Sequence, residues 1–257
     1  MQPFVKSSLA NMQPDALAFN GCINQDSKNT TPANCITTNS LRWVGTEAGT
    51  APDPCWSAGY ANGGDPNSNV YQPAEADTTL QNGDQWFWNP SAGIRSLAEL
   101  QAVYHATVGR NAFLMMDFAP NQDGRIADDQ AARYKEFGDW VRSCYGAAPI
   151  SQIGPVTATL GQPVVLQLPG KAAAINRVVL QEDQSGGQAI LKYLVEANDG
   201  EAGAFRQVSS GTSIGNKKID LFTSAEITNA TAFRLTILDA ARLQTTVARF
   251  AVLHCND

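Results

Sequence analysis

The sequence predicts an α/β region followed by an all-β region. Residues 97–145 show the order helix, buried strand, loop, helix, and short alternating strands follow from about residue 150. The first order is typical of an α/β barrel or a doubly wound sheet, and the second of an antiparallel β-sandwich. A chain of 257 residues is long enough for two such domains. We therefore expect one domain at 1–148 and another at 149–257.

Helix and strand patterns alternate in the first region. Leu97 to Val108 carries apolar residues at helical spacing after a candidate N-cap, Ser96. Phe113 to Met116 is a continuous apolar run, as expected of a strand buried on both faces of a parallel sheet. Asp128 to Tyr145 has a second helical pattern. Shorter signals upstream predict a helix ending near residue 13, strands at 16–19 and 41–45, and loops at 21–40 and 50–70.

The second region alternates apolar and polar residues, with Gly, Asn and Asp turns between the runs. This pattern predicts half-buried antiparallel strands. The expected strands are 164–168, 177–180, 190–195, 233–237 and 247–253. No cluster of titratable residues stands out in this region, so we expect it to carry no chemistry.

Charge and composition exclude several classes of protein. A net charge of −6 argues against binding to nucleic acid or to an anionic membrane. No apolar run approaches the roughly 18 residues that a membrane span needs. The two histidines lie far apart, and the five cysteines form no CxxC pair, so we expect no metal and no cofactor.

The cysteines and two glycosylation motifs indicate a secreted or lysosomal glycoprotein. Cys22 and Cys35 flank a polar loop in which a small disulfide is plausible. Asn29 and Asn229 each begin an Asn-x-Thr tripeptide. The first residues lack the pattern of a signal peptide, so the protein is either intracellular or begins upstream of Met1. The cysteines favour the second interpretation.

Two motifs combine carboxylates with aromatic residues. The first is Arg42-Trp-Val-Gly-Thr-Glu47, in which Glu47 follows a short strand, where barrel enzymes place catalytic groups. The second runs from Tyr71-Gln-Pro-Ala-Glu75-Ala-Asp77 to Trp86-Phe87-Trp88. Acids for proton transfer beside rings that stack on a sugar are typical of carbohydrate sites. The alternative interpretation is that Glu47 pairs with Arg42 at the surface and that the aromatic residues belong to the core.

The order of these motifs resembles family 29 of the glycoside hydrolases, the α-L-fucosidases. A third segment, Val108-Gly-Arg-Asn111 with Leu114-Met-Met-Asp-Phe-Ala-Pro120, continues the resemblance, which covers most of residues 8–253. It implies the C-terminal strands of a (β/α)8 TIM-type barrel, then a galactose-binding-like β-sandwich. It also implies that terminal α-L-fucose is removed from glycans with retention of configuration.

The resemblance implies roles for five residues. Glu47 corresponds to the acid/base, with Glu75 as the alternative. Arg42, Trp43 and Trp86 are the expected substrate-binding residues. In a retaining enzyme, a second carboxyl group about 5–5.5 Å away attacks the anomeric carbon. The expected partner is a fucosylated oligosaccharide or glycoprotein glycan.

Two departures from the family pattern affect this interpretation. Thr46 stands where the family usually has Asn. The nucleophile of the family is an Asp in a Trp-x-Asp-Gly motif on barrel strand 4, and the sequence has no such motif. We therefore expect a fragment that lacks the nucleophile. The alternative is a non-catalytic carbohydrate-binding remnant of the same fold, which would use its tryptophans on the former site.

Overall fold

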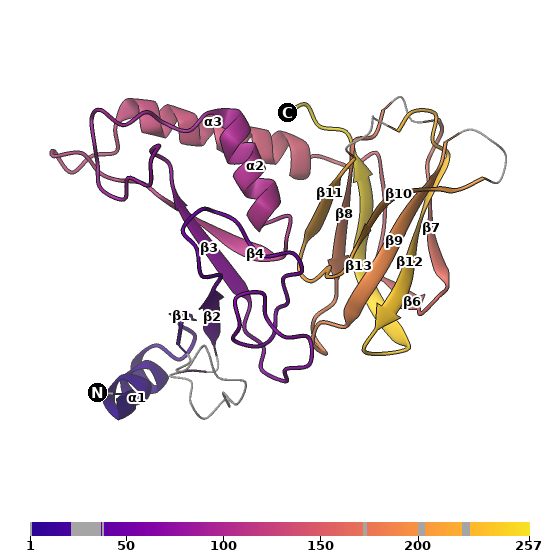
Figure 1. Cartoon of the computed structure of the whole chain (residues 1–257), viewed down its shortest axis with the longest axis horizontal. Coiled ribbons are helices and arrows are strands. Elements are labelled where there is room, and N and C mark those ends of the chain that lie inside the picture. Colours follow the sequence, from indigo (N-terminus) through magenta and orange to yellow (C-terminus); the bar gives the residue numbers. More distant parts are fainter. Residues whose placement is uncertain (1, 22–36, 38, 172–173, 200–203, 223–226) are drawn as a thin grey trace.

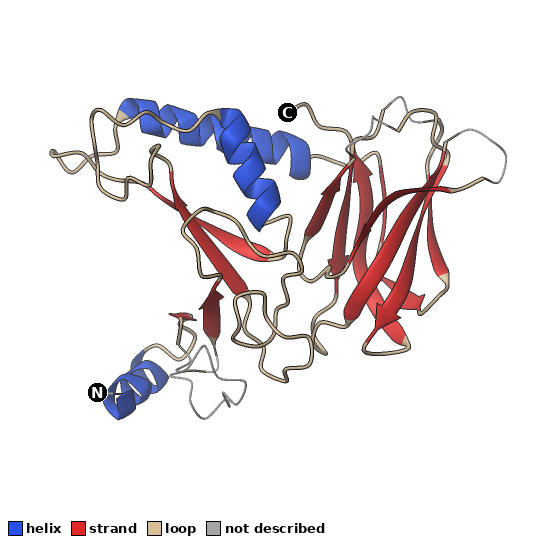
Figure 2. Ribbon diagram, viewed as in Figure 1, coloured by secondary structure: helices blue, strands red, loops and turns tan. Residues whose placement is uncertain are grey.

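A computed structural model describes residues 2–21, 37, 39–171, 174–199, 204–222 and 227–257. Helices and parallel strands form the first part of the chain, and antiparallel strands form the second (Figures 1 and 2). The predicted pair Cys22–Cys35 and the motif at Asn29 lie outside the described residues. None of the described helices is long and apolar enough to cross a membrane.

The first part contains a four-stranded parallel sheet in the order β1-β2-β3-β4. In chain order, the helices and strands of the first part are α1 (Gln2–Met12), β1 (Ala18–Phe19), β2 (Ser40–Trp43), β3 (Ala74–Thr79), α2 (Leu97–Thr107), β4 (Ala112–Asp117) and α3 (Asp128–Tyr145). The two long helices and the strand at 113–116 confirm the sequence prediction, but the expected burial of this strand on both faces is wrong, since Phe113 and Met115 are half-exposed. Ser96 caps α2 as expected, because its hydroxyl accepts a hydrogen bond from the backbone N–H of Glu99.

The two faces of the parallel sheet differ in their environment. Side chains alternate along a strand, so Leu114 and Met116 of β4 share one face and pack against the cluster formed by α2 and α3. Phe113 and Met115 lie on the opposite face and are 54% and 50% exposed. A parallel sheet with helices on one face is the arrangement expected for an arc of a (β/α)8 barrel. Its closure into a barrel stays a prediction.

The second part consists of two antiparallel sheets that enclose a common apolar cluster (Figure 2). Their orders are β10-β9-β12-β7 and β11-β8-β13-β5, with β6 paired to β13. The strands are β5 (Ser151–Ile153), β6 (Val156–Thr159), β7 (Pro163–Gln167), β8 (Arg177–Glu182), β9 (Ile190–Asn198), β10 (Arg206–Gly211), β11 (Lys218–Leu221), β12 (Ala232–Ala240) and β13 (Gln244–Leu253). All five strands expected here are present. The galactose-binding-like class and the boundary at 148/149 stay predictions.

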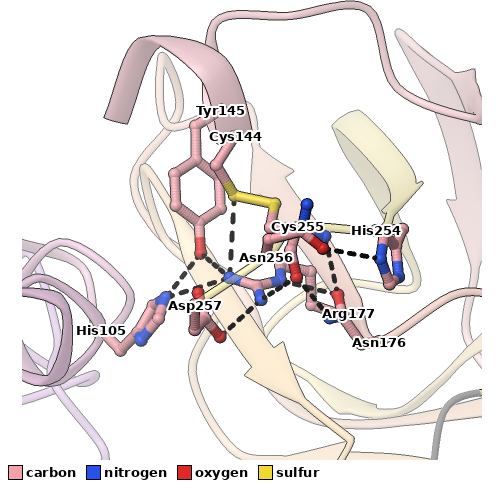
Figure 3. A network of polar contacts seen from close by, with 9 residues as sticks. All are labelled: His105, Cys144, Tyr145, Asn176, Arg177, His254, Cys255, Asn256 and Asp257. Atoms are coloured by element: carbon pink, nitrogen blue, oxygen red, sulfur yellow. Dashed lines mark hydrogen bonds and ion pairs between the residues drawn. A yellow bond between two sulfur atoms is a disulfide. The ribbon is translucent and has the colours of Figure 1, made fainter. Parts of the chain in front are cut away.

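A disulfide and a buried arginine join the two parts (Figure 3). Cys144 at the end of α3 is bonded to Cys255 beyond β13. Beside them, the Arg177 side chain is 1% exposed and pairs with Asp257 at 2.7 Å. Its Nη1 also donates to Tyr145 Oη at 2.9 Å and lies 3.3 Å from His105 Nε2. One polar cluster therefore joins helix α2, helix α3, β8 and the C-terminal segment.

Burial and the neighbouring Arg177 guanidinium lower the pKa of His105 to about 4, against a smaller opposing effect of Asp257. The folded protein therefore prefers the neutral imidazole. This preference contributes stability fully above pH ~6.5, and the contribution is lost as the pH falls toward the folded pKa. We expect the wild type to lose about 1–2 kcal/mol more unfolding free energy than His105→Gln between pH 7 and 4.5, after allowance for partial exposure.

Urea unfolding of both proteins at the two pH values measures this difference. Glu182, whose pKa burial raises to about 7, acts in the opposite direction, but it is present in both proteins and cancels. Equal pH dependence of the two proteins would contradict a depressed pKa at His105.

Candidate active site

The candidate site lies at the edge of the parallel sheet where β2, β3 and β4 end. Carboxyl ends of parallel strands meet at one edge, and the loops that follow them build the sites of α/β proteins. Glu47 follows β2, Trp86 lies in the loop after β3, and Asp117 is the last residue of β4. The sheet thus brings three separate stretches of the sequence to one edge.

The backbone on both sides of Glu47 is hydrogen-bonded to β3. Val44 N donates to Glu75 O at 3.0 Å, and Gly49 N donates to Asp77 O at 2.9 Å. Within this segment, Ala48 N donates to the Thr46 hydroxyl at 3.3 Å. The Glu47 side chain is exposed. Its backbone is therefore held beside the carboxyl half of β3, while its carboxyl group remains free to meet a ligand.

The hydrogen bond from Gly49 N to Asp77 O requires a glycine at position 49. The φ of Gly49 is +65°, and a Cβ there would lie 2.9 Å from side-chain atoms of Thr78 and Val103. We expect Gly49→Ala to cost about 3 kcal/mol of unfolding free energy, from backbone strain and from overpacking. Gly83→Ala is the matched control, because Gly83 has φ +71° and open space around its Cβ position. It should cost only about 1 kcal/mol. Equal losses in chemical denaturation would mean that the segment bearing Glu47 is not packed against β3 and α2.

Glu75 lies on the half-exposed face of the sheet. It pairs in register with Trp43 on β2 and Phe113 on β4. The pKa of the Glu75 carboxyl is raised by burial and, to a lesser extent, by the nearby Asp77. Asp77 accepts a hydrogen bond from Trp43 Nε1 at 2.8 Å. The structure therefore groups Trp43, Glu75 and Asp77 on one face.

The loop after β3 presents the aromatic residues. The buried side chain of Gln81 donates to the carbonyl oxygens of Gln85 and Phe87, at 3.2 and 3.0 Å, and accepts from Asn89 N at 3.1 Å. Trp86, which lies in sequence between the two residues whose carbonyl groups are bonded, is half-buried, and the adjacent Phe87 is 87% exposed. Gln81 thus fixes an aromatic loop at the same edge as Glu47.

Arg42 lies apart from these groups. Its side chain is 1% exposed and shares a face with Ala74, opposite to Glu75. The guanidinium donates to the carbonyl oxygens of Asn62, Trp56 and Gln72 at 3.2, 2.9 and 2.8 Å. These bonds hold the long loop between β2 and β3. The predicted surface pair with Glu47 is absent from the described residues, and the structure does not bring Arg42 to the other predicted site residues.

Known proteins with similar sequences and structures share one family. Residues 19–146 match the family model described as Alpha-L-fucosidase. Alpha-L-fucosidase 1 of Arabidopsis thaliana is 26% identical over 244 residues, covering 79% of this chain and 47% of that protein. A solved Bacteroides thetaiotaomicron structure, provisionally named an α-L-fucosidase, is 30% identical with a TM-score of 0.75, over 86% of this chain and 55% of that one. A Ruminococcus gnavus GH29 fucosidase in complex with fucose is 21% identical with a TM-score of 0.74. The match covers 87% of this chain and 52% of that one.

The chain belongs to the α-L-fucosidase family. It spans about half the length of the curated relatives that it matches, 47% in each case. The relatives that it matches are named as fucosidases. The family model covers β1 to α3, which are the elements that position Glu47, Glu75 and Trp86.

The structure of this α-L-fucosidase family member adds Asp117 to the site. One Asp117 carboxylate oxygen is buried without a hydrogen-bond partner among the described residues, and burial raises the pKa of this group. Its position after the apolar run Leu114-Met-Met was the available sequence signal. No group of three or more His, Cys, Asp or Glu side chains suited to a metal ion occurs in the described part of the chain.

Proposed function

We propose that this chain supplies the acid/base side of a retaining α-L-fucosidase active site, with Glu47 as the acid/base. The observation that carries the proposal is the attachment of the Glu47 backbone to β3 at both ends, with the carboxyl group left exposed. Glu75 is the second residue of β3, further from the carboxyl edge. Barrel enzymes place their reacting groups at that edge, which favours Glu47.

The proposed reaction takes place in two steps. Glu47 donates its proton to the glycosidic oxygen as the bond to the anomeric carbon breaks, and a carboxylate attacks that carbon from the opposite side. Glu47 then removes a proton from water, which displaces the carboxylate and releases fucose with its configuration retained. In this proposal, the attacking carboxylate belongs to a part of the enzyme outside the 257 residues.

Trp86 and Trp43 are the proposed sugar-contacting residues. Trp86 lies in the loop that Gln81 anchors, and Trp43 is held by its bond to Asp77. Aromatic faces pack against the apolar face of a pyranose, while neighbouring carboxylates accept hydrogen bonds from its hydroxyls. Arg42 has no proposed contact with the substrate, because its donors are used within the fold.

Hydrolysis of an aryl α-L-fucoside tests the proposal. We expect no turnover from the purified 257-residue chain, and turnover with retained configuration from a longer version that includes the upstream family segment. Proton NMR of the first-formed fucose distinguishes retention from inversion. Retaining turnover by the 257-residue chain alone would show that the nucleophile is one of its own carboxylates, with Asp77 and Asp117 the first to replace.

We also propose that the protein folds in an oxidising compartment, secreted or lysosomal. The Cys144–Cys255 disulfide supports this, because such bonds persist outside the reducing cytosol. Asn229, in the Asn-x-Thr motif, is exposed at a turn with φ +57° and is accessible to a glycosyltransferase.

A further inference from the structure

A cavity lies between the loop that precedes β3 and the turn between β8 and β9. Its volume is about 550 Å³, within the range of small-molecule sites. Trp56 and Tyr71 line it from the first part of the chain, and Gln184 and Gln188 line it from the second. Tyr71 lies three residues before β3 begins, whereas Trp86 lies beyond its end. The length of β3, about 20 Å, therefore separates Tyr71 from the carboxyl edge of the sheet, where the loop of Trp86 begins.

Two polar atoms of the residues that line this cavity have no partner among the described residues. Gln184 Oε1 and Gln188 Nε2 are both buried and unpaired. The orientation of the Gln188 amide is fixed, because its Oε1 accepts a hydrogen bond from the backbone N–H of Ser57 at 2.7 Å. Its NH₂ group therefore remains as a donor. A buried donor and a buried acceptor without partners cost about 1–3 kcal/mol each, a cost that a hydrogen-bonding ligand would remove once a small side-chain shift opens the two atoms to the cavity.

Hydrogen bonds hold the turn that carries both glutamines. Gly187 N donates to Gln184 O at 2.9 Å and closes the turn. Arg242 donates to the carbonyl oxygens of Gly186 and Gly187, each at 2.7 Å. At the base of the turn, the Glu182 carboxylate accepts from Ala189 N at 2.7 Å. The two glutamine side chains are therefore presented from a preformed wall, which lowers the entropic cost of binding.

The opposite wall offers an aromatic ring. Tyr71 is 53% exposed, and its hydroxyl has no partner among the described residues. Trp56 lies beside it and is 8% exposed. None of the described residues that line the cavity is charged. An exposed ring, amide donors and acceptors, and no charge suit a neutral polyhydroxylated ligand.

We propose that this cavity binds a neutral saccharide unit of a glycan, separately from the reaction centre. The choice of glycan as the ligand class rests on the proposed function. Tyr71 packs against one face of the sugar ring, while Gln184 accepts from a hydroxyl and Gln188 donates to one. A glycan held here would keep a branched or polymeric substrate on the enzyme between cleavage events.

Saturation-transfer NMR and calorimetry on the full 257-residue chain test this site without any turnover, so a failure of the catalytic proposal does not affect the result. The probes are lactose, N-acetyllactosamine, their fucosylated forms and cellotriose. We expect at least one to bind with a Kd of about 0.1–10 mM. Tyr71→Ala should weaken that binding at least about fivefold. Tyr134→Ala, at a ring of similar exposure (49%) on α3, is the matched control and should not change it.

Gln184→Met separates binding from folding. It removes an unpaired buried acceptor, so the unfolding free energy should stay unchanged or rise, while affinity falls at least about threefold. No binding of any probe up to about 20 mM would overturn the proposal. Loss of binding in Trp86→Ala but not in Tyr71→Ala would also overturn it, because the saccharide would then occupy the candidate active site.

Discussion

Glu47→Gln, made in the longer enzyme that we propose, is expected to lower kcat by about 10²–10⁴-fold on fucosides with poor leaving groups. A glutamine keeps the size of the side chain but cannot donate a proton to the departing oxygen. The loss should be much smaller on aryl fucosides with acidic phenols, because these leave without protonation. Steady-state rates for a series of aryl fucosides of decreasing phenol acidity measure this dependence.

Glu75→Gln is the matched control for Glu47→Gln. Glu75 lies on the same face of the sheet as Trp43 and Asp77, so its replacement should reduce activity without a steep dependence on the leaving group. The raised pKa of Glu75 would itself suit a general acid. The argument against that role is that Glu75 lies near the start of β3, away from the carboxyl edge of the sheet. If the steep dependence followed Glu75→Gln and not Glu47→Gln, the two roles would have to be exchanged.

Removal of the Cys144–Cys255 disulfide is expected to cost about 2–5 kcal/mol of unfolding free energy. The two cysteines are separated by 111 residues in sequence, so the bond excludes many conformations of the unfolded chain. It also holds the end of α3 against the C-terminal segment, where Arg177 is buried. Chemical denaturation of a Cys144→Ala/Cys255→Ala variant measures the loss.

Dithiothreitol supplies the control for the disulfide experiment. Reduction should lower the stability of the wild type to that of the reduced double variant, and any effect of reduction on the double variant itself reports the predicted Cys22–Cys35 disulfide. The single free cysteine among the described residues, Cys55, is buried, so we expect it not to exchange in the folded protein. A wild type that is insensitive to reduction would contradict the role given to this bond.

Patterns of apolar residues predicted the helices and most strands, but not β3 or the short strands β5, β6, β10 and β11. The sequence of β3, Ala-Glu-Ala-Asp-Thr-Thr, has small and acidic residues in place of the apolar run that is typical of a buried parallel strand, so it was interpreted only as part of a motif. Only its position between β2 and β4 makes a strand of it, because the neighbours supply the hydrogen bonds on both sides. The placement of Glu75 and Asp77 on one face could therefore not be predicted from local propensity.

Residue type alone could not assign Arg42. An arginine beside Trp43 and near Glu47 suits a substrate-binding role in sequence, yet alternation along β2 directs Arg42 and Trp43 to opposite faces. Trp43 faces Glu75, whereas Arg42 faces the carbonyl groups of the following loop. The roles of Glu47, Glu75, Trp43 and Trp86 remain predictions, although the strand end expected for Glu47 is present.

Azide rescue tests the assignment of the acid/base most directly. In Glu47→Ala of the longer enzyme, an aryl α-L-fucoside with a good leaving group should still form the covalent fucosyl intermediate, which then accumulates because no base activates water. Azide needs no base, so it should attack the anomeric carbon, displace the carboxylate and restore turnover with α-L-fucosyl azide as the product. Formation of this retained azide by Glu47→Ala, and not by Glu75→Ala, is the predicted result. Rescue of Glu75→Ala alone, or an inverted azide from Glu47→Ala, would contradict the assignment of Glu47.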